Sequence, residues 1–363
     1  MQKMGRLFLV LLPISLALPG AQAPATQEQP PAQVEPSDQV YRTTVRVVIA
    51  PVTVTDKVGD FVNGLQPGDF TLYDNGHKQK SVVDVTYRPI SMVVAVQANN
   101  MMDAILPKIQ RMGNVIDDLV VGQEGEVAVI AFDHRIRPML DFTTDAGKVS
   151  DALKKITAGS SSSRMIDATL EGVRMLSHRP EERRRILLLI SEKRDIASSG
   201  RLKEAVTAAQ LQNVFIYSVD ISRLMTSLTG QPIPSVAPPI PPAAQHVGIG
   251  GTATPNDIDQ NYNIGNAVPA LMDVYDEVKK PFVHNPVDTL TGLTGGREYT
   301  FIKEAALEHA LAQLGEELHS QYFVSYHPND LTEPGFHSIR VEVDRPSLVI
   351  RTRPGYWVAG AGE

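Results

Sequence analysis

Polar and charged side chains suited to binding a ligand are concentrated in three segments of the chain. Residues 97–102 read QANNMM, residues 160–168 read SSSSRMIDA and residues 191–195 read SEKRD. The first and third follow apolar runs typical of buried strands, and the second precedes a helical pattern. Ligands of an open parallel sheet collect outside the carboxyl ends of its strands. We therefore expect the three segments to form loops on one edge of a sheet and to carry the binding chemistry.

The sequence lacks the motifs of common catalytic sites. It has no HExxH, GxSxG or P-loop pattern, and its histidines lie apart without the spacing of metal ligands. A glycine-rich stretch at residues 248–251 lies in a proline-rich segment, outside the strand–turn–helix context of a dinucleotide site. We predict a protein that is not an enzyme. An enzyme on the same scaffold is a less favoured alternative, because a fold does not determine a function.

The composition is that of a folded protein with more than one domain. The chain has 363 residues, of which 42% are hydrophobic and 21% charged, and a domain holds about 100–200 residues. The net charge of -7 argues against a general nucleic-acid binder. With no cysteine, the chain can form neither a disulfide nor a thiolate metal site.

The first residues have the pattern of an export signal. Lys3 and Arg6 precede an apolar run, and residues 21–23 read AQA, so we expect residues 1–23 to be a signal peptide. Residues 24–40, rich in Pro, Gln and Ala, are typical of a linker. Since no other segment approaches the roughly 20 apolar residues of a membrane span, we expect a periplasmic or secreted protein without a span.

Two kinds of hydrophobic period divide the rest of the chain. Residues 41–89 and 328–358 have period two, which predicts strands of one small β-sandwich built from both ends of the chain. In residues 90–327, apolar strands alternate with amphipathic helices, which predicts a doubly wound, mainly parallel α/β sheet completed by a strand at residues 322–326. Residues 222–286 form a Pro/Gly-rich insertion with one short helix expected at 269–280.

The basic run Arg183, Arg184 and Arg185 precedes the apolar strand of residues 186–190. In a chain of negative net charge we interpret it as solvated charge at a turn between a helix and a strand.

The order of these elements, the three loops and two tail segments carry a family resemblance. The tail segments read QYFVSY at residues 321–326 and RTRPGY at 351–356. Over roughly residues 41–357 the chain resembles the von Willebrand factor type A (VWFA)-related proteins common in acidobacteria. The resemblance implies a metal-ion-dependent adhesion site with Asp-x-Ser-x-Ser after the first strand, a Thr before a later helix and an Asp after the fourth strand.

The chain departs from that ligand pattern at nearly every position. Gln97 stands in place of the first Asp, Asn99 and Met101 in place of the two serines, Ser163 in place of the Thr and Glu192 in place of the last Asp. Magnesium and calcium prefer oxygen ligands that include carboxylates, and Glu192 alone is charged. The resemblance therefore implies a degenerate site in which Gln97, Asn99, Ser163 and Glu192 are the remaining candidate ligands for Mg²⁺ or another divalent cation; no other cofactor is expected.

Two further interpretations of the loops stay open. Gln97, Asn99 and Asn100 could cap a helix that begins near Asp103, with Asp167 as a helix N-terminal acid. Alternatively, cationic side chains could hold an acidic group of a protein partner directly, in place of the metal. The candidate partner-binding residues are Asn99, Asn100, Ser163, Arg164, Lys193 and Arg194.

The sequence as a whole predicts an exported module for protein–protein interaction, of the adhesion or scaffold type, with a degenerate metal site. The alternative is an adhesion module that depends on Mg, Mn or Ca through altered ligands. The sequence does not identify the partner.

Overall fold

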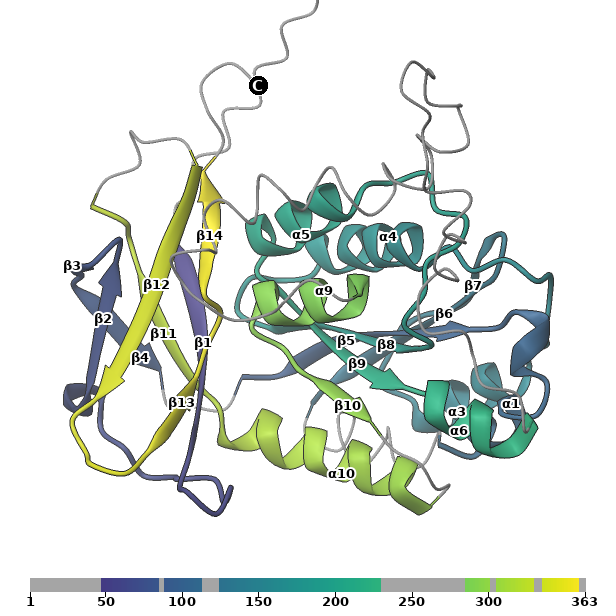
Figure 1. Cartoon of the computed structure of the whole chain (residues 1–363), viewed down its shortest axis with the longest axis horizontal. Coiled ribbons are helices and arrows are strands. Elements are labelled where there is room, and N and C mark those ends of the chain that lie inside the picture. The colour runs from purple at the N-terminus through teal and green to yellow at the C-terminus, as the bar shows by residue number, and fades with distance from the viewer. Residues whose placement is uncertain are drawn as a thin grey trace, which may run out of the picture. The chain divides into compact units, whose positions relative to one another are not determined.

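A computed structural model of the chain describes residues 47–84, 88–112, 124–229, 285–300, 305–329 and 335–358 (Figure 1). The expected signal peptide, linker and helix at 269–280 lie outside the described residues. Within the described ranges, no helix is both long and apolar enough to cross a membrane.

A six-stranded sheet forms the centre of the α/β part. Its order is β10-β9-β8-β5-β6-β7, and all neighbours are parallel except the antiparallel pair β6–β7. The strands are β5 (Ile90–Gln97), β6 (Glu126–Phe132), β7 (Ile136–Thr143), β8 (Arg184–Ser191), β9 (Val214–Asp220) and β10 (Glu298–Thr300). Every residue of β5, β6, β8 and β9 is buried, which explains why these strands lack polar alternation. The predicted α/β sheet is confirmed.

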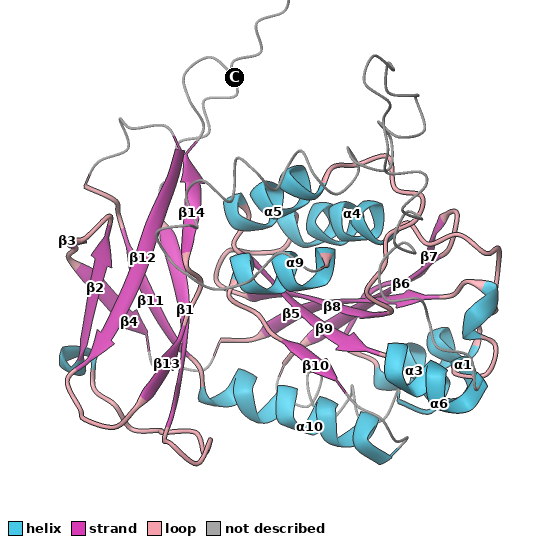
Figure 2. Ribbon diagram, in the orientation of Figure 1, coloured by secondary structure: helices cyan, strands magenta, loops and turns pink. Residues whose placement is uncertain are grey.

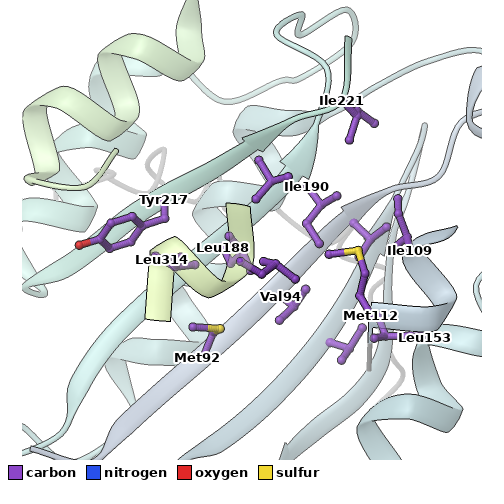
Figure 3. Close-up of a cluster of buried hydrophobic side chains, with 14 of the residues drawn as sticks. Met92, Val94, Ile109, Met112, Leu153, Leu188, Ile190, Tyr217, Ile221 and Leu314 are labelled. Carbon is purple, nitrogen blue, oxygen red and sulfur yellow. The ribbon is translucent and has the colours of Figure 1, made fainter. Parts of the chain in front are cut away.

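Helices cover both faces of this sheet (Figure 2). On one face lie α1 (Leu106–Ile109), α3 (Ala146–Lys154), α6 (Ser222–Thr229) and α10 (Ala305–Ser320), together with the 3-10 turns η2 (Asn100–Met102) and η3 (Gln110–Met112). On the other lie α4 (Met165–Ser177), α5 (Leu202–Leu211) and α9 (Pro286–Thr294). Alternate residues of each strand supply the two cores. Met92 and Val94 of β5 pack with Ile109, Leu153 and Leu314 (Figure 3), and Val93 packs on the opposite side.

The remaining strands form two antiparallel four-stranded sheets, with orders β13-β1-β11-β4 and β14-β12-β2-β3. Their strands are β1 (Val48–Thr55), β2 (Phe70–Asp74), β3 (His77–Lys78), β4 (Ser81–Asp84), β11 (Tyr322–Tyr326), β12 (Gly335–Val343), β13 (Val349–Arg351) and β14 (Gly355–Val358), with the turn η1 (Pro67–Asp69) between β1 and β2. One hydrophobic core takes residues from both sheets, among them Val52, Leu72, Val324 and Val341. We call these eight strands the two-sheet unit.

The expected place of β11 is wrong. The strand at residues 322–326 was expected to complete the parallel sheet, but it pairs antiparallel with β1 and β4. Its apolar run serves two cores, because Tyr322, Val324 and Tyr326 face the core of the two-sheet unit whereas Phe323 packs in the α/β core. The ring of Phe323 lies 6.0 Å from that of Phe215. The α/β part therefore ends with α10, and not at residue 327.

The insertion expected at residues 222–286 is partly regular. Its first residues form α6, where Leu224 and Met225 are 2% and 1% exposed, and its last residue, Pro286, begins α9. Pro at the first position of a helix is favourable because its missing N–H would have no partner there. Asn285 caps this helix by accepting the Asp288 N–H at 2.9 Å.

The interpretation of Arg183–Arg185 as solvated is wrong as well. Arg184 and Arg185 are 5% and 7% exposed. Arg183 lies 3.3 Å from Glu126, Arg184 donates to Gln321 at 3.0 Å, and Arg185 donates to the backbone carbonyl of Gln212 at 2.9 Å. Partners from distant segments thus bury the run, which local sequence cannot reveal.

Candidate functional site

The three polar loops meet at the carboxyl end of the sheet. Gln97 ends β5, Glu192 follows β8, and Ser163 precedes α4. Backbone hydrogen bonds join the loops: Gly159 N–H donates to Ala98 O at 2.7 Å, Asn100 N–H to Ser160 O at 2.9 Å, and Ile196 N–H to Ser163 O at 3.0 Å. The structure therefore brings these segments together.

Gln97 and Glu192 form a closed, fully buried pair. Both are 0% exposed. The Gln97 amide Nε2 donates to Glu192 Oε1 at 2.9 Å, and the Glu192 N–H donates back to Gln97 Oε1 at 3.0 Å. Arg194 Nη2 donates to the second carboxylate oxygen, Oε2, at 3.2 Å. Both oxygens of the only carboxylate among the candidate ligands therefore already accept a hydrogen bond, one of them from a cation.

Asn99 and Ser163 are buried polar groups without a partner. Both side chains are 0% exposed, and neither the Asn99 amide nor the Ser163 hydroxyl has a hydrogen-bond partner among the described residues. Asn99 occupies the N-cap position of η2, yet its side chain makes no capping bond, so side-chain capping by Asn99 is not observed. Asn100 is exposed. Since buried polar groups are normally satisfied, the Asn99 amide and the Ser163 hydroxyl each suit an ordered water or a polar ligand group.

Each of the three cationic side chains among the candidate partner-binding residues already forms an ion pair within the protein. Arg164 lies 2.5 Å from Asp167, Lys193 lies 2.6 Å from Glu298, and Arg194 pairs with Glu192. About a third of each cationic side chain is exposed, at 30%, 35% and 31% respectively. An acidic group of a partner would have to share these cations with the protein's own carboxylates.

Two acidic residues at this edge were not predicted from the sequence. Asp220 ends β9 and Glu298 begins β10. The Lys193 ammonium lies 3.6 Å from the Asp220 carboxylate and 2.6 Å from the Glu298 carboxylate. Burial, reinforced by a hydrogen bond with Asp288, raises the pKa of Glu298 to about 7. Burial opposes the charge of Lys193, but Glu298 and Asp220 more than compensate and raise its pKa. The strand-end rule that selected Gln97 and Glu192 would also have found Asp220.

Asp133 and Asp167 fix the shape of the loops. Asp133, just after β6, accepts the N–H of Arg135 at 2.8 Å and of Ser160 at 3.3 Å. Burial opposes its charge, but these backbone bonds, together with the nearby His134 and Arg137, outweigh burial and lower the pKa of Asp133. Asp167 accepts the N–H groups of residues 199 and 200 at 3.0 and 2.7 Å. Asp167 is thus an acidic residue in the first turn of α4, as expected, and it also holds the loop at residues 199–200 by hydrogen bonds.

The four candidate ligands fit a hard divalent cation poorly. Glu192 supplies one carboxylate, the amides and the hydroxyl are neutral, and the Arg194 guanidinium lies against the carboxylate. Within the described ranges, no group of three His, Cys, Asp or Glu side chains could hold a metal ion. Mg²⁺ and Ca²⁺ bind through several oxygens with carboxylate charge, so the donor set lacks the charge that such a cation requires.

No protein-family model and no curated protein matches the chain. Among solved structures, it is similar to a conserved hypothetical protein BatB from Bacteroides thetaiotaomicron, with 14% identity over 62% of this chain and 99% of that chain and a TM-score of 0.39. The SpRpn10 VWA domain aligns with 8% identity over 62% of this chain and 95% of that chain, with a TM-score of 0.36. Proximal thread matrix protein 1 from the mussel byssus aligns with 12% identity over 69% and 51% of the two chains, with a TM-score of 0.41.

The element order, the doubly wound sheet and the meeting of the three loops agree with the fold that the resemblance implies. The relation to the acidobacterial group stays a prediction. The α/β part of the chain is a doubly wound, mainly parallel sheet with helices on both faces, which is the architecture that the resemblance to von Willebrand type A-related proteins implies.

Proposed function

We propose that this chain is an exported, non-enzymatic protein-interaction module whose strand-end loops bind a protein partner without a divalent cation. One observation carries the proposal: the buried carboxylate of Glu192 is balanced by the guanidinium of Arg194 at 3.2 Å. An internal cation thus stands next to the residue at which the family pattern has a metal-ligating Asp. We also interpret the two-sheet unit as the β-sandwich predicted from the two ends of the sequence.

The surface around this pair is suited to a polar partner. Asn100 and Met101 are exposed, Met101 at 40%, and Arg164, Lys193 and Arg194 in the other two loops are each about one third exposed. Because each of these cationic side chains already pairs with a carboxylate of the protein, charge steers the partner but contributes modestly to affinity. The unpaired Asn99 amide and Ser163 hydroxyl, both fully buried, supply hydrogen bonds to the partner through an ordered water.

A divalent-cation titration tests the metal-free mechanism. We expect no binding heat when chelator-treated full-length protein is titrated with Mg²⁺, Mn²⁺ or Ca²⁺. The unpaired oxygens of Asn99 and Ser163 favour the competing function, a metal-dependent adhesion module with altered ligands. Tight binding that disappears in Glu192→Ala would establish that competitor and overturn the proposal.

Charge-reversal variants test the binding surface. Arg194→Glu and Arg164→Glu should weaken retention of partners from the extracellular fraction in the presence of chelator, by about tenfold each if one charge-assisted contact is lost. Arg174→Glu is the matched control, since Arg174 is 62% exposed on α4 and pairs with Glu171. Equal retention by all three variants would remove these loops from the binding surface. Turnover in a broad hydrolase panel that is lost in Glu192→Ala would contradict the non-enzymatic role.

A further inference from the structure

A cavity of about 440 Å³ lies away from the strand-end loops. It is lined by the beginnings of β1 and β8, the residues that follow α5, and β14. Its volume falls within the range of small-molecule sites, about 300–1,000 Å³. The walls are partly apolar, with Val48, Phe215 and Phe323 among them, and partly basic.

Arg353 lines this cavity as a buried cation without a counter-charge. It is 1% exposed, and within the described ranges no hydrogen bond or ion pair of its guanidinium is found, the buried Nε included. Arg351, two residues earlier, shows the usual solution: it pairs with the buried carboxylate of Glu317 and donates to the Gly296 carbonyl at 2.8 Å. Buried charges are normally paired, because an isolated one is costly. Arg353 therefore calls for an anion that the described chain does not supply.

Two further donors line the same cavity. Arg185, 7% exposed, donates to the backbone carbonyls of Arg179 and Gln212 but forms no ion pair with a described carboxylate, and its Nε has no partner among the described residues. The indole Nε1 of Trp357 is buried and likewise has no partner in the described part of the chain. Glu181 and Glu182 also line the cavity, but both are exposed, and they favour the charge of Arg185 only from a distance.

The charge of Arg353 persists at neutral pH. Burial lowers its pKa to about 10, while the phenols of Tyr326 and Tyr356 oppose that shift. The cavity thus combines a desolvated positive charge, free N–H donors and aromatic walls. Guanidinium groups bind carboxylates and phosphates in bidentate fashion, and the apolar walls favour a ligand with an apolar body over a bare inorganic ion.

We propose that this cavity binds a small organic carboxylate, whose anionic group pairs with Arg353 and whose apolar body lies along Val48, Phe215 and Phe323. Arg185 adds positive potential, and the Trp357 indole donates to the ligand. The tail segment at residues 351–356 then has a role in binding as well as in packing, independent of the strand-end loops.

Trp357 is the only tryptophan in the 363 residues, so its fluorescence reports directly on the cavity. Full-length protein is titrated with hexanoate, acetate and inorganic phosphate, with chloride keeping the ionic strength constant. We expect a saturable change with hexanoate and at least about tenfold weaker binding of acetate, which lacks the apolar body. Hexanoate should also raise the melting temperature, since it binds only the folded state.

Variants distinguish a specific site from general anion effects. Arg353→Met should abolish the hexanoate response, and Arg353→Lys should weaken it about tenfold, because lysine keeps the charge but loses the fork of donors. The control Arg340→Met removes an arginine that is 61% exposed on β12 and should bind as the unaltered protein does. If Arg353→Met does not fold, Arg353→Lys and Arg185→Met carry the test.

Three results would overturn the proposal. The first is the absence of a saturable fluorescence change with hexanoate up to about 10 mM, because binding weaker than this is too weak for a small-molecule site. The second is a hexanoate response in Arg353→Met or Arg353→Lys equal to that of the unaltered protein. The third is a response to phosphate and not to hexanoate, which would exclude an organic carboxylate as the ligand. None of these results bears on the metal titration at Glu192, so the two proposals fail or succeed separately.

Discussion

At the scale of single residues, the Glu192–Arg194 pair makes the most direct prediction. Arg194→Met removes the cation that pairs with the fully buried carboxylate of Glu192 and leaves the Gln97 amide as its side-chain hydrogen-bond donor. Removing one partner of a buried ion pair is costly, and because Arg194 is 31% exposed we expect a loss of about 2–3 kcal/mol in the free energy of unfolding. Adding Glu192→Gln should recover most of it, since the unpaired charge is then gone. Urea denaturation of the single and double variants measures both effects.

The exposed pair Arg174–Glu171 provides the scale for that measurement. Arg174→Met should change the free energy of unfolding by no more than about 0.5 kcal/mol. If Arg194→Met costs no more than this control, the guanidinium does not balance the buried carboxylate, and the metal-free mechanism loses its basis.

Sequence reasoning found part of this site and not the rest. Gln97, Ser163 and Glu192 could be found because strand ends and helix starts are visible in the hydrophobic pattern. The pairing of Arg194 with Glu192 could not, because two residues in one loop face each other only in a particular backbone conformation. The burial of Arg184 is equally invisible, since its partner Gln321 lies 137 positions away.

At the scale of elements, the turn between α9 and β10 depends on close contact of two backbones. A Cβ on Gly296 would lie 1.9 Å from the carbonyl oxygen of Ile216 in β9, and main-chain atoms cannot move aside as a side chain does. We expect Gly296→Ala to lower the free energy of unfolding by about 2–3 kcal/mol. Gly68→Ala, whose added Cβ would have no neighbour within 4 Å, should change it by less than about 0.5 kcal/mol. Equal melting temperatures for the two variants would contradict this packing.

The pattern of elements was predictable where one period dominates. The buried strands and the helices α3, α4 and α5 of residues 90–220 follow from fully apolar runs and from the period of 3.6, but the antiparallel edge strand β7 was not predicted. Periodicity could not place β11, because a run that is apolar at every position fits a parallel strand between helices as well as an antiparallel strand between two cores. Nor was α9 predicted, although Asn285 and Pro286 form a start signal of the kind that begins helices.

At the scale of the whole molecule, single side chains join the α/β part to the two-sheet unit. The Gln210 amide in α5 donates to the Leu293 carbonyl at 2.8 Å and to the Gly355 carbonyl at 3.3 Å, and its oxygen accepts the backbone N–H of Trp357 at 3.2 Å. Phe323 is 4% exposed and belongs to the core of the α/β part, whereas both its neighbours in β11 belong to the core of the two-sheet unit. Neither part can lose its packing without exposing residues of the other.

We therefore expect the described parts of residues 47–358 to unfold in one cooperative transition, with coincident midpoints from Trp357 fluorescence and far-ultraviolet circular dichroism. Phe323→Ala should lower the free energy of unfolding by about 3–5 kcal/mol, as for other buried phenylalanines, and should shift both midpoints together because the cavity it leaves lies where the two cores meet. Val82→Ala on the neighbouring strand β4, at a side chain 67% exposed, should change it by less than about 0.5 kcal/mol. Two separate transitions in the unaltered protein, or a shift of only one midpoint in Phe323→Ala, would mean that β11 does not couple the two cores.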